Sequence, residues 1–85
     1  MESKKIVRDQ IFEIVKNQMN SNNPPKTNLT FERLKGLGYS DPDAKKLIGQ
    51  CVAGEIFNIL KYKIPFNEVR YVTNLKNLPK EPFED

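Results

Sequence analysis

The sequence predicts an all-α protein, a compact antiparallel bundle of four helices in which the third helix is central. Apolar residues recur at helical spacing, no segment alternates as a half-buried strand would, and helix start and stop signals separate the apolar segments. Short connections between such helices favour antiparallel neighbours. Because the chain has 85 residues, we expect residues 1–79 to form a single helical domain with a modest core. Residues 80–85 are expected to be a flexible acidic tail.

The first helix is expected to run from about Ser3 to Asn20. Its apolar residues fit one stripe at helical spacing: Ile6, Val7, Ile11, Ile14, Val15 and Met19. Charged residues fall on the opposite face, at Lys5, Asp9, Glu13 and Lys16. The polar run NSNN then ends this helix.

The Asn-Pro-Pro run that begins at Asn23 predicts the start of the second helix. Asparagine can cap free backbone N–H groups, and proline is tolerated in the first turn. We expect this helix to reach about Lys35, although its threonine and asparagine residues are poor helix formers. Its inward residues are expected to be Leu29, Phe31 and Leu34. Gly36 and Gly38 then supply a left-handed turn.

The run SDPD, from Ser40 to Asp43, predicts the start of the third helix, which continues to about Tyr62. Serine caps the helix, proline fits its first turn, and the aspartates complement the positive end of the helix dipole. This helix is the longest and most apolar of the four, so we place it at the centre. It presents a broad apolar arc: Ala44, Leu47, Ile48, Cys51, Val52, Ile56, Ile59 and Leu60.

The fourth helix is expected to begin after Asn67, which caps it, and to end near Leu78, before a proline. Phe66 precedes the cap and Tyr71 follows it at the spacing of a hydrophobic staple, so the two rings are expected to pack together.

Two charged residues lie where apolar residues are expected. Glu55 falls near the middle of the apolar arc of the third helix, and Arg8 falls between Ile11 and Val15 on the apolar arc of the first. Because burying a lone ion is costly, we predict that Arg8 and Glu55 form a buried polar pair, with the hydroxyl of a tyrosine, Tyr62 or Tyr71, as a further partner. The alternatives are that Glu55 is solvated in a groove between helices, or that it is a functional carboxylate.

The composition excludes several kinds of chemistry within one chain. There is no histidine, so Cys/His zinc sites, Ser-His-Asp triads and Cys-His dyads cannot form. Glu55 is the one inward carboxylate, and a single carboxylate without imidazole is a poor metal site. We therefore expect no catalytic residue, no metal ligand and no cofactor, and the protein is not expected to be an enzyme. Cys51 is the single cysteine and is interpreted as a small core residue.

The N-terminal residues, the lack of a long apolar run and the net charge predict the location of the protein and its candidate partners. The first residues lack the apolar region of a signal peptide, and no apolar run is long enough to span a membrane, so we expect a cytoplasmic protein. The net charge of +3 is mild. A candidate basic patch near the ends of the third helix consists of Lys45, Lys46, Lys61, Lys63 and Arg70, and it makes nucleic acid a candidate partner. The acidic start of the third helix argues against a helix-turn-helix motif.

The runs NPPKTNLTFERLKGLGYSDPDAKKLIGQCVAGEIF and PFNEVRYVTNLKNLP resemble a small uncharacterised family of all-helical bacterial proteins, a domain of unknown function. The resemblance covers about Gln18 to Pro79 and implies a bacterial cytoplasmic protein. In what looks like the wider family, histidines align with these positions: Arg8, Phe12, Pro42 and Lys46. If those histidines bind metal in relatives, the resemblance implies that this chain has lost the site and that Glu55 is a surviving member of a polar cluster.

Taken together, these observations favour a small helical protein–protein interaction or adaptor module. Its partner is expected to be another protein or a second copy of the chain, because self-association can stabilise a domain with so small a core. One alternative is a weakly basic nucleic-acid-associated protein. The other is an enzyme or metal site around Glu55, which the lack of histidine disfavours.

Overall fold

The computed structural model describes residues 2–80, with side chains from residue 8 onward. Residues 81–85 lie outside the described residues, and so does most of the acidic tail expected from the sequence. The described part contains four α-helices and no strand, which confirms the all-α prediction: α1 (Glu2–Ser21), α2 (Pro25–Gly36), α3 (Asp41–Tyr62) and α4 (Glu68–Asn77).

Local signals in the sequence set most of the helix boundaries. The Ser40 hydroxyl accepts a hydrogen bond from the Asp43 backbone N–H at 3.3 Å and starts α3, as expected. The Asn67 side chain accepts from the Arg70 N–H at 2.9 Å and starts α4. Gly38 has φ of 105°, a conformation that glycine adopts without steric cost, and it turns the chain between α2 and α3.

The start of α2 differs from the prediction. The residue at the N-cap position is Pro24, not Asn23, and no side chain caps the helix. The fixed φ of proline is compatible with this position and with the helical residue that follows, so α2 begins without a polar cap.

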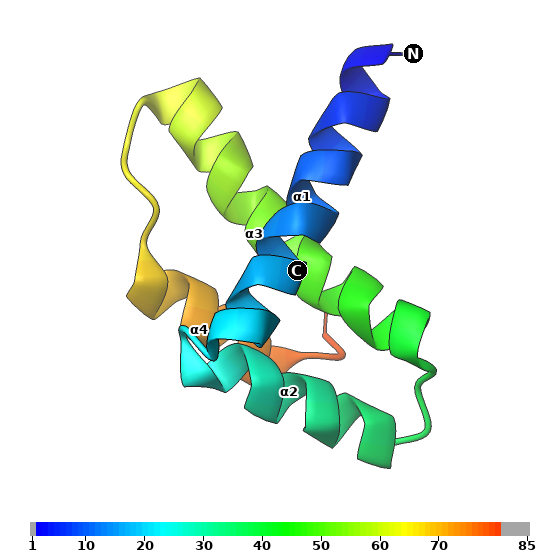
Figure 1. Cartoon of the computed structure of the whole chain (residues 1–85). Helices are drawn as coiled ribbons and strands as arrows, with labels where there is room; N and C mark the ends of the chain where they lie inside the picture. Colours follow the sequence, from blue (N-terminus) through cyan, green and yellow to red (C-terminus); the bar gives the residue numbers. More distant parts are fainter. Residues whose placement is uncertain (1, 81–85) are drawn as a thin grey trace.

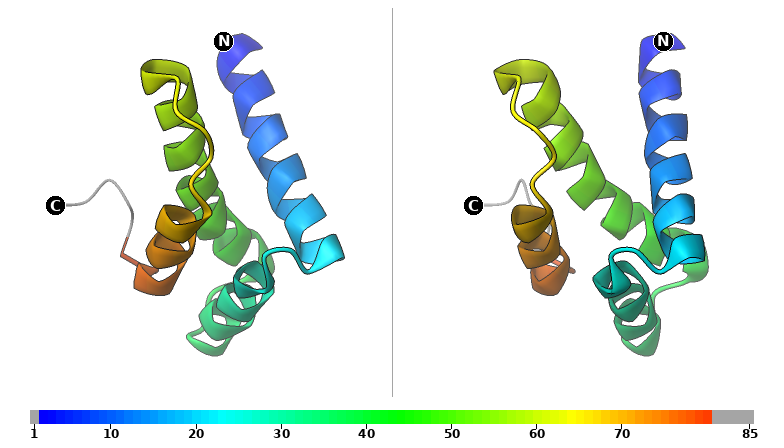
Figure 2. Two further views of the ribbon diagram at one scale, coloured as in Figure 1. Left: turned by 90° about the vertical axis from the view of Figure 1, so that its left-hand side faces the viewer. Right: turned by 60° about the vertical axis from the view of Figure 1, so that its left-hand side comes forward.

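α3 is the central helix and contacts each of the other three. α2 and α4 each run in the direction opposite to α3, and α1 crosses α3 near the middle of both helices (Figure 1). At this crossing, Gly49 lets α1 come close, because a Cβ built on Gly49 would lie 3.2 Å from the Ile11 methyl carbon Cγ2. Beyond the crossing, the N-terminal half of α1 diverges from the C-terminal half of α3 (Figure 2).

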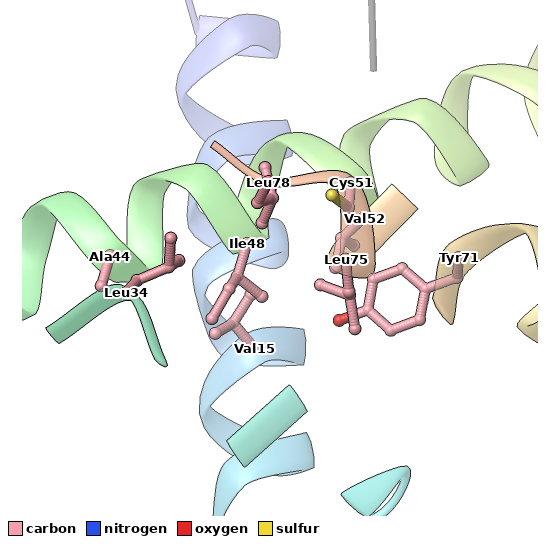
Figure 3. Close-up of a cluster of buried hydrophobic side chains, with 9 residues drawn as sticks. All are labelled: Val15, Leu34, Ala44, Ile48, Cys51, Val52, Tyr71, Leu75 and Leu78. Atoms are coloured by element: carbon pink, nitrogen blue, oxygen red, sulfur yellow. The ribbon is translucent and has the colours of Figure 1, made fainter. Parts of the chain in front are cut away.

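The core lies where all four helices meet around one face of α3 (Figure 3). Its fully buried apolar residues come from every helix and from the residue after α4: Val15, Leu34, Ala44, Ile48, Cys51, Val52, Tyr71, Leu75 and Leu78. Phe66 packs against the Tyr71 ring with centroids 5.3 Å apart, which confirms the predicted staple. No described helix is long and apolar enough to cross a membrane.

Two inward predictions were wrong. Leu29 of α2 is 62% exposed and Leu60 of α3 is 64% exposed. The inner face of α2 is instead completed by Thr27 and Thr30, beside the correctly predicted Leu34. Threonine can be buried at position 27 because its hydroxyl has hydrogen-bond partners there, which an apolar pattern in the sequence does not reveal.

Candidate functional site

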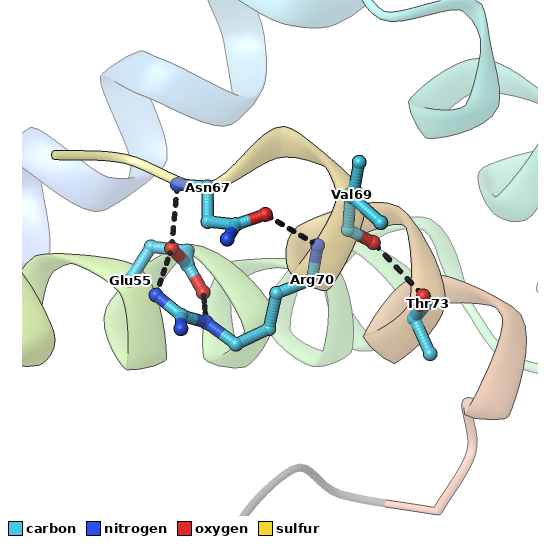
Figure 4. A network of polar contacts seen from close by, with 5 residues as sticks. All are labelled: Glu55, Asn67, Val69, Arg70 and Thr73. Carbon is cyan, nitrogen blue, oxygen red and sulfur yellow. Dashed lines mark hydrogen bonds and ion pairs between the residues drawn. The ribbon is translucent and has the colours of Figure 1, made fainter.

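Glu55 is buried, and its carboxylate joins α3 to the start of α4 (Figure 4). Arg70 donates two hydrogen bonds to it, from Nε to Oε2 at 2.6 Å and from Nη2 to Oε1 at 2.9 Å. The backbone N–H of Asn67 donates a third, to Oε1 at 2.9 Å. This bidentate pair at a helix N-terminus satisfies the carboxylate with three donors.

The structure corrects the predicted partner of Glu55. The side chain of Arg8 is exposed and makes no ion pair with Glu55, whose cation is Arg70. Neither tyrosine joins this contact: Tyr62 is exposed, and Tyr71 bonds elsewhere. The hydrogen bonds from Arg70 lower the pKa of Glu55, and the N–H of Asn67 lowers it further against the opposing effect of burial. Glu55 is therefore ionised at neutral pH and makes a structural contact.

The other end of α4 is held by a second arginine. Arg33 of α2 donates from Nη1 to the Leu78 carbonyl at 2.8 Å and from Nη2 to the Leu75 carbonyl at 2.9 Å. α4 thus has a carboxylate at its N-terminus and a guanidinium at its C-terminus, the signs that complement the helix dipole. The role of Arg33 is not predictable from the sequence, because an arginine on a helix surface gives no signal of a carbonyl far along the chain.

A third polar cluster connects α4 to α1 and α2. The Tyr71 hydroxyl donates to the Gln18 oxygen Oε1 at 2.6 Å, and the Thr27 hydroxyl donates to the same oxygen at 2.8 Å. The two hydroxyls are 3.2 Å apart. Burial raises the pKa of Tyr71 to about 12, so the hydroxyl is a neutral donor at physiological pH. These groups satisfy one another and hold the three helices in register.

Cys51 is fully buried on the inner face of α3. Burial raises the pKa of its thiol to about 12, so it stays protonated and unreactive at neutral pH. Among the described residues, no group of three or more acidic or cysteine side chains is arranged to hold a metal ion.

The predicted basic patch does not form one surface. Lys46 and Lys61 lie about 22 Å apart along α3 at the rise of an α-helix. Arg70 is neutralised by Glu55. Lys45 lies over the Phe31 ring near the start of α3, whereas Lys63 follows its end. These residues therefore divide between the two ends of α3.

The side of α3 that faces away from the core, which we call the outer face, is polar at its N-terminal end and apolar from Ala53 onward. It consists of residues at successive helical spacings: Lys46, Gln50, Ala53, Phe57 and Leu60. Phe57 is 50% exposed and Leu60 64% exposed. The sequence analysis assigned Leu60 to the core arc and gave no role to Phe57 or Ala53.

The outer face continues into a groove between α1 and α3, which we call the α1–α3 groove. Its volume is about 440 Å³, and it is lined by residues of both helices: Arg8, Ile11, Phe12, Lys46, Gly49, Gln50 and Ala53. The Gln50 oxygen Oε1 is buried and has no hydrogen-bond partner among the described residues. The groove brings together three of the positions that the family resemblance aligns with histidines, Arg8, Phe12 and Lys46, but not Pro42.

Comparisons with models of known protein families, with curated proteins and with solved structures find no match to this chain. The resemblance to a bacterial helical family therefore stays a prediction.

Proposed function

We propose that this protein is a small helical protein-interaction module, as the sequence favours. The observation that carries the proposal is that the C-terminal half of α3 is apolar on two sides. Its inner face forms the core, and its outer face leaves Phe57 and Leu60 at least half exposed. A helix that is apolar on opposite sides is normally covered on both, so the outer face is suited to a partner.

The neighbouring surface strengthens the proposal. The last residue of α3, the loop after it and the start of α4 add further exposed apolar side chains that follow Phe57 and Leu60 in the chain: Tyr62, Ile64, Phe66 and Val69. Isolated exposed apolar residues are common, but such a succession within one helix end and one connection is typical of interaction surfaces.

Nucleic-acid binding gains no specific support, because the basic residues are divided between the ends of α3 and Arg70 is paired. The cytoplasmic location and the bacterial family stay proposals that rest on the sequence.

The test is affinity capture from the native cell with the full chain and two matched variants. Phe57→Asp places a charge on the outer face, and Leu29→Asp places one on an apolar position of α2 that is also more than a third exposed. We expect a protein that binds the parent and Leu29→Asp but is lost with Phe57→Asp, while circular dichroism shows that both variants are folded. Capture profiles identical for the parent and Phe57→Asp would contradict the proposal.

A further inference from the structure

We propose that the α1–α3 groove and the outer face together bind an amphipathic helix of a partner protein, with an apolar stripe flanked by acidic side chains. This inference rests on the proposed function and specifies the chemistry of the partner. It follows from the length, the shape and the charge of the surface.

The length of the surface fits a helix. From Lys46 to Leu60, the outer face extends about 21 Å along α3, which matches about four turns of a partner helix. Helix-in-groove recognition uses side chains at helical spacing that enter an apolar channel. The groove alone is large enough for a few such side chains, and the outer face supplies the rest of the contact.

The shape of the surface favours close approach in the middle. Ala53 has a short side chain, so it leaves space at the centre of the outer face, and the larger Phe57 and Leu60 follow it at helical spacing and are at least half exposed. Phe12, which is 43% exposed, contributes an apolar wall from α1. An apolar side chain of the partner would fit over Ala53, beside the Phe12 ring that lines the same groove.

The charged side chains beside the α1–α3 groove and the outer face are basic, so they favour a partner with acidic side chains. The charged residues that line the groove are Arg8 and Lys46, and no acidic side chain lines it among the described residues. At the other end, the Lys61 ammonium lies 5.3 Å from the centre of the Phe57 ring. Cations at both ends of an apolar strip match carboxylates on the flanks of a bound helix, and this complementarity favours association.

The same charges disfavour a second copy as the occupant. In a two-fold symmetric dimer through this face, each copy presents the same residues to the other, so Lys46 and Lys61 of one copy would meet the cations of its partner. Like charges brought together at an interface are costly.

The test measures binding of two labelled synthetic peptides to the full chain by fluorescence anisotropy. Both are helical, about 16 residues long, and share one leucine stripe, but one carries glutamate flanks and the other lysine flanks. We expect the glutamate peptide to bind at least about tenfold more tightly, and added salt to weaken it. Lys46→Glu should reduce this preference, Ala53→Glu should abolish binding, and Leu29→Asp should leave binding unchanged. Amide shifts in NMR spectra should map to the groove and the outer face.

Equal binding of the two peptides, or binding that Ala53→Glu leaves intact, would overturn this inference. Light scattering after size exclusion distinguishes it from the proposed function. A dimer that Phe57→Asp converts to a monomer would make the second copy the occupant, which refutes the acidic helix but keeps the interaction module. A monomer whose captured partners all survive Phe57→Asp would refute both.

Discussion

The two faces of α3 differ in whether their unusual residues are buried and hydrogen-bonded within the described part of the chain: Glu55 on the inner face is, and Phe57 and Gln50 on the outer face are not. The inner face is apolar and contains one carboxylate, Glu55, which receives three hydrogen bonds from Arg70 and Asn67. The outer face is apolar from Ala53 onward, but Phe57 is half exposed and the Gln50 oxygen lacks a partner among the described residues. The inner face is covered by the other helices of the chain, whereas the outer face leaves apolar side chains exposed to solvent.

This difference shows why a charged residue on the inner face of a helix is weak evidence for a catalytic or ligand-binding role. A buried carboxylate that accepts three hydrogen bonds and faces a guanidinium has a structural explanation, because these partners offset the cost of removing it from water. Exposed apolar surface beside an unsatisfied polar atom has no such internal explanation. The exposed apolar side chains Phe57 and Leu60 are therefore the features of α3 that a partner would explain.

The largest expected effect is the difference in stability loss when a side chain on each face of α3 is truncated to alanine. Ile48→Ala removes a fully buried side chain from the inner face, so it should cost about 2–5 kcal/mol, including the cavity left behind. Leu60→Ala removes a side chain that is 64% exposed, and it should change stability by less than about 0.5 kcal/mol. Urea denaturation of both variants measures the contrast. Equal losses would mean that the outer face is part of the core.

The second largest expected effect is a loss of stability at high pH, caused by two buried groups at the inner face of α3. The Cys51 thiol ionises near pH 9 when unfolded, but burial raises its pKa to about 12 in the fold. The folded state therefore keeps a proton that the unfolded state releases, so stability falls as pH rises from 9 to 12, by up to about 4 kcal/mol. Tyr71 adds to this loss because burial raises its pKa from 10.0 to about 12. Cys51→Ala should flatten the stability profile above pH 9, and an unchanged slope would contradict the assignment.

Much of the fold could be predicted from the sequence, because its signals are local. Serine at Ser40 and asparagine at Asn67 cap the helices that they were expected to cap, and Phe66 packs on Tyr71. The boundaries of α3 follow from such signals and from apolar periodicity.

The partner of Glu55 could not be predicted in the same way. A helical wheel gives the direction of a side chain around its own axis, and it correctly placed Glu55 inside. It does not say which neighbouring helix that direction meets. Arg8 and Arg70 were both available, and the crossing of α1 over α3 decides between them by leaving Arg8 on the surface. The outer face was not predicted, because one apolar arc of the helical wheel was assigned to the core and the opposite side was not considered.

The Glu55 contact should have an intermediate effect. Glu55→Gln keeps the shape but removes the charge that Arg70 and the start of α4 require, so it should cost about 1–3 kcal/mol. The contacts with Arg70 lower the pKa of Glu55, so their contribution is complete above about pH 4.5 and is lost as pH falls through the lowered value. Thermal melts of the two proteins should therefore differ at pH 7 and converge in acid. A constant difference between them down to acid pH would mean that the charge of Glu55 contributes nothing.

The smallest effect should come from Gly49, where the two faces of α3 meet α1. Gly49→Ala gains helix propensity of about 1 kcal/mol, but the new Cβ would lie 3.2 Å from the Ile11 methyl. That methyl is bonded directly to the Ile11 Cβ, so it moves only with a small rotation of this stiff side chain or a small shift of α1, and the resulting strain offsets much of the gain in propensity. We expect a net change in unfolding free energy below about 1 kcal/mol, measured by urea denaturation. Gly49→Val should destabilise much more, because its added methyl groups reach further into α1 and cannot be accommodated by Ile11 alone. If valine were tolerated as well as alanine, the close crossing of α1 and α3 would be wrong, and with it the geometry of the groove beside it.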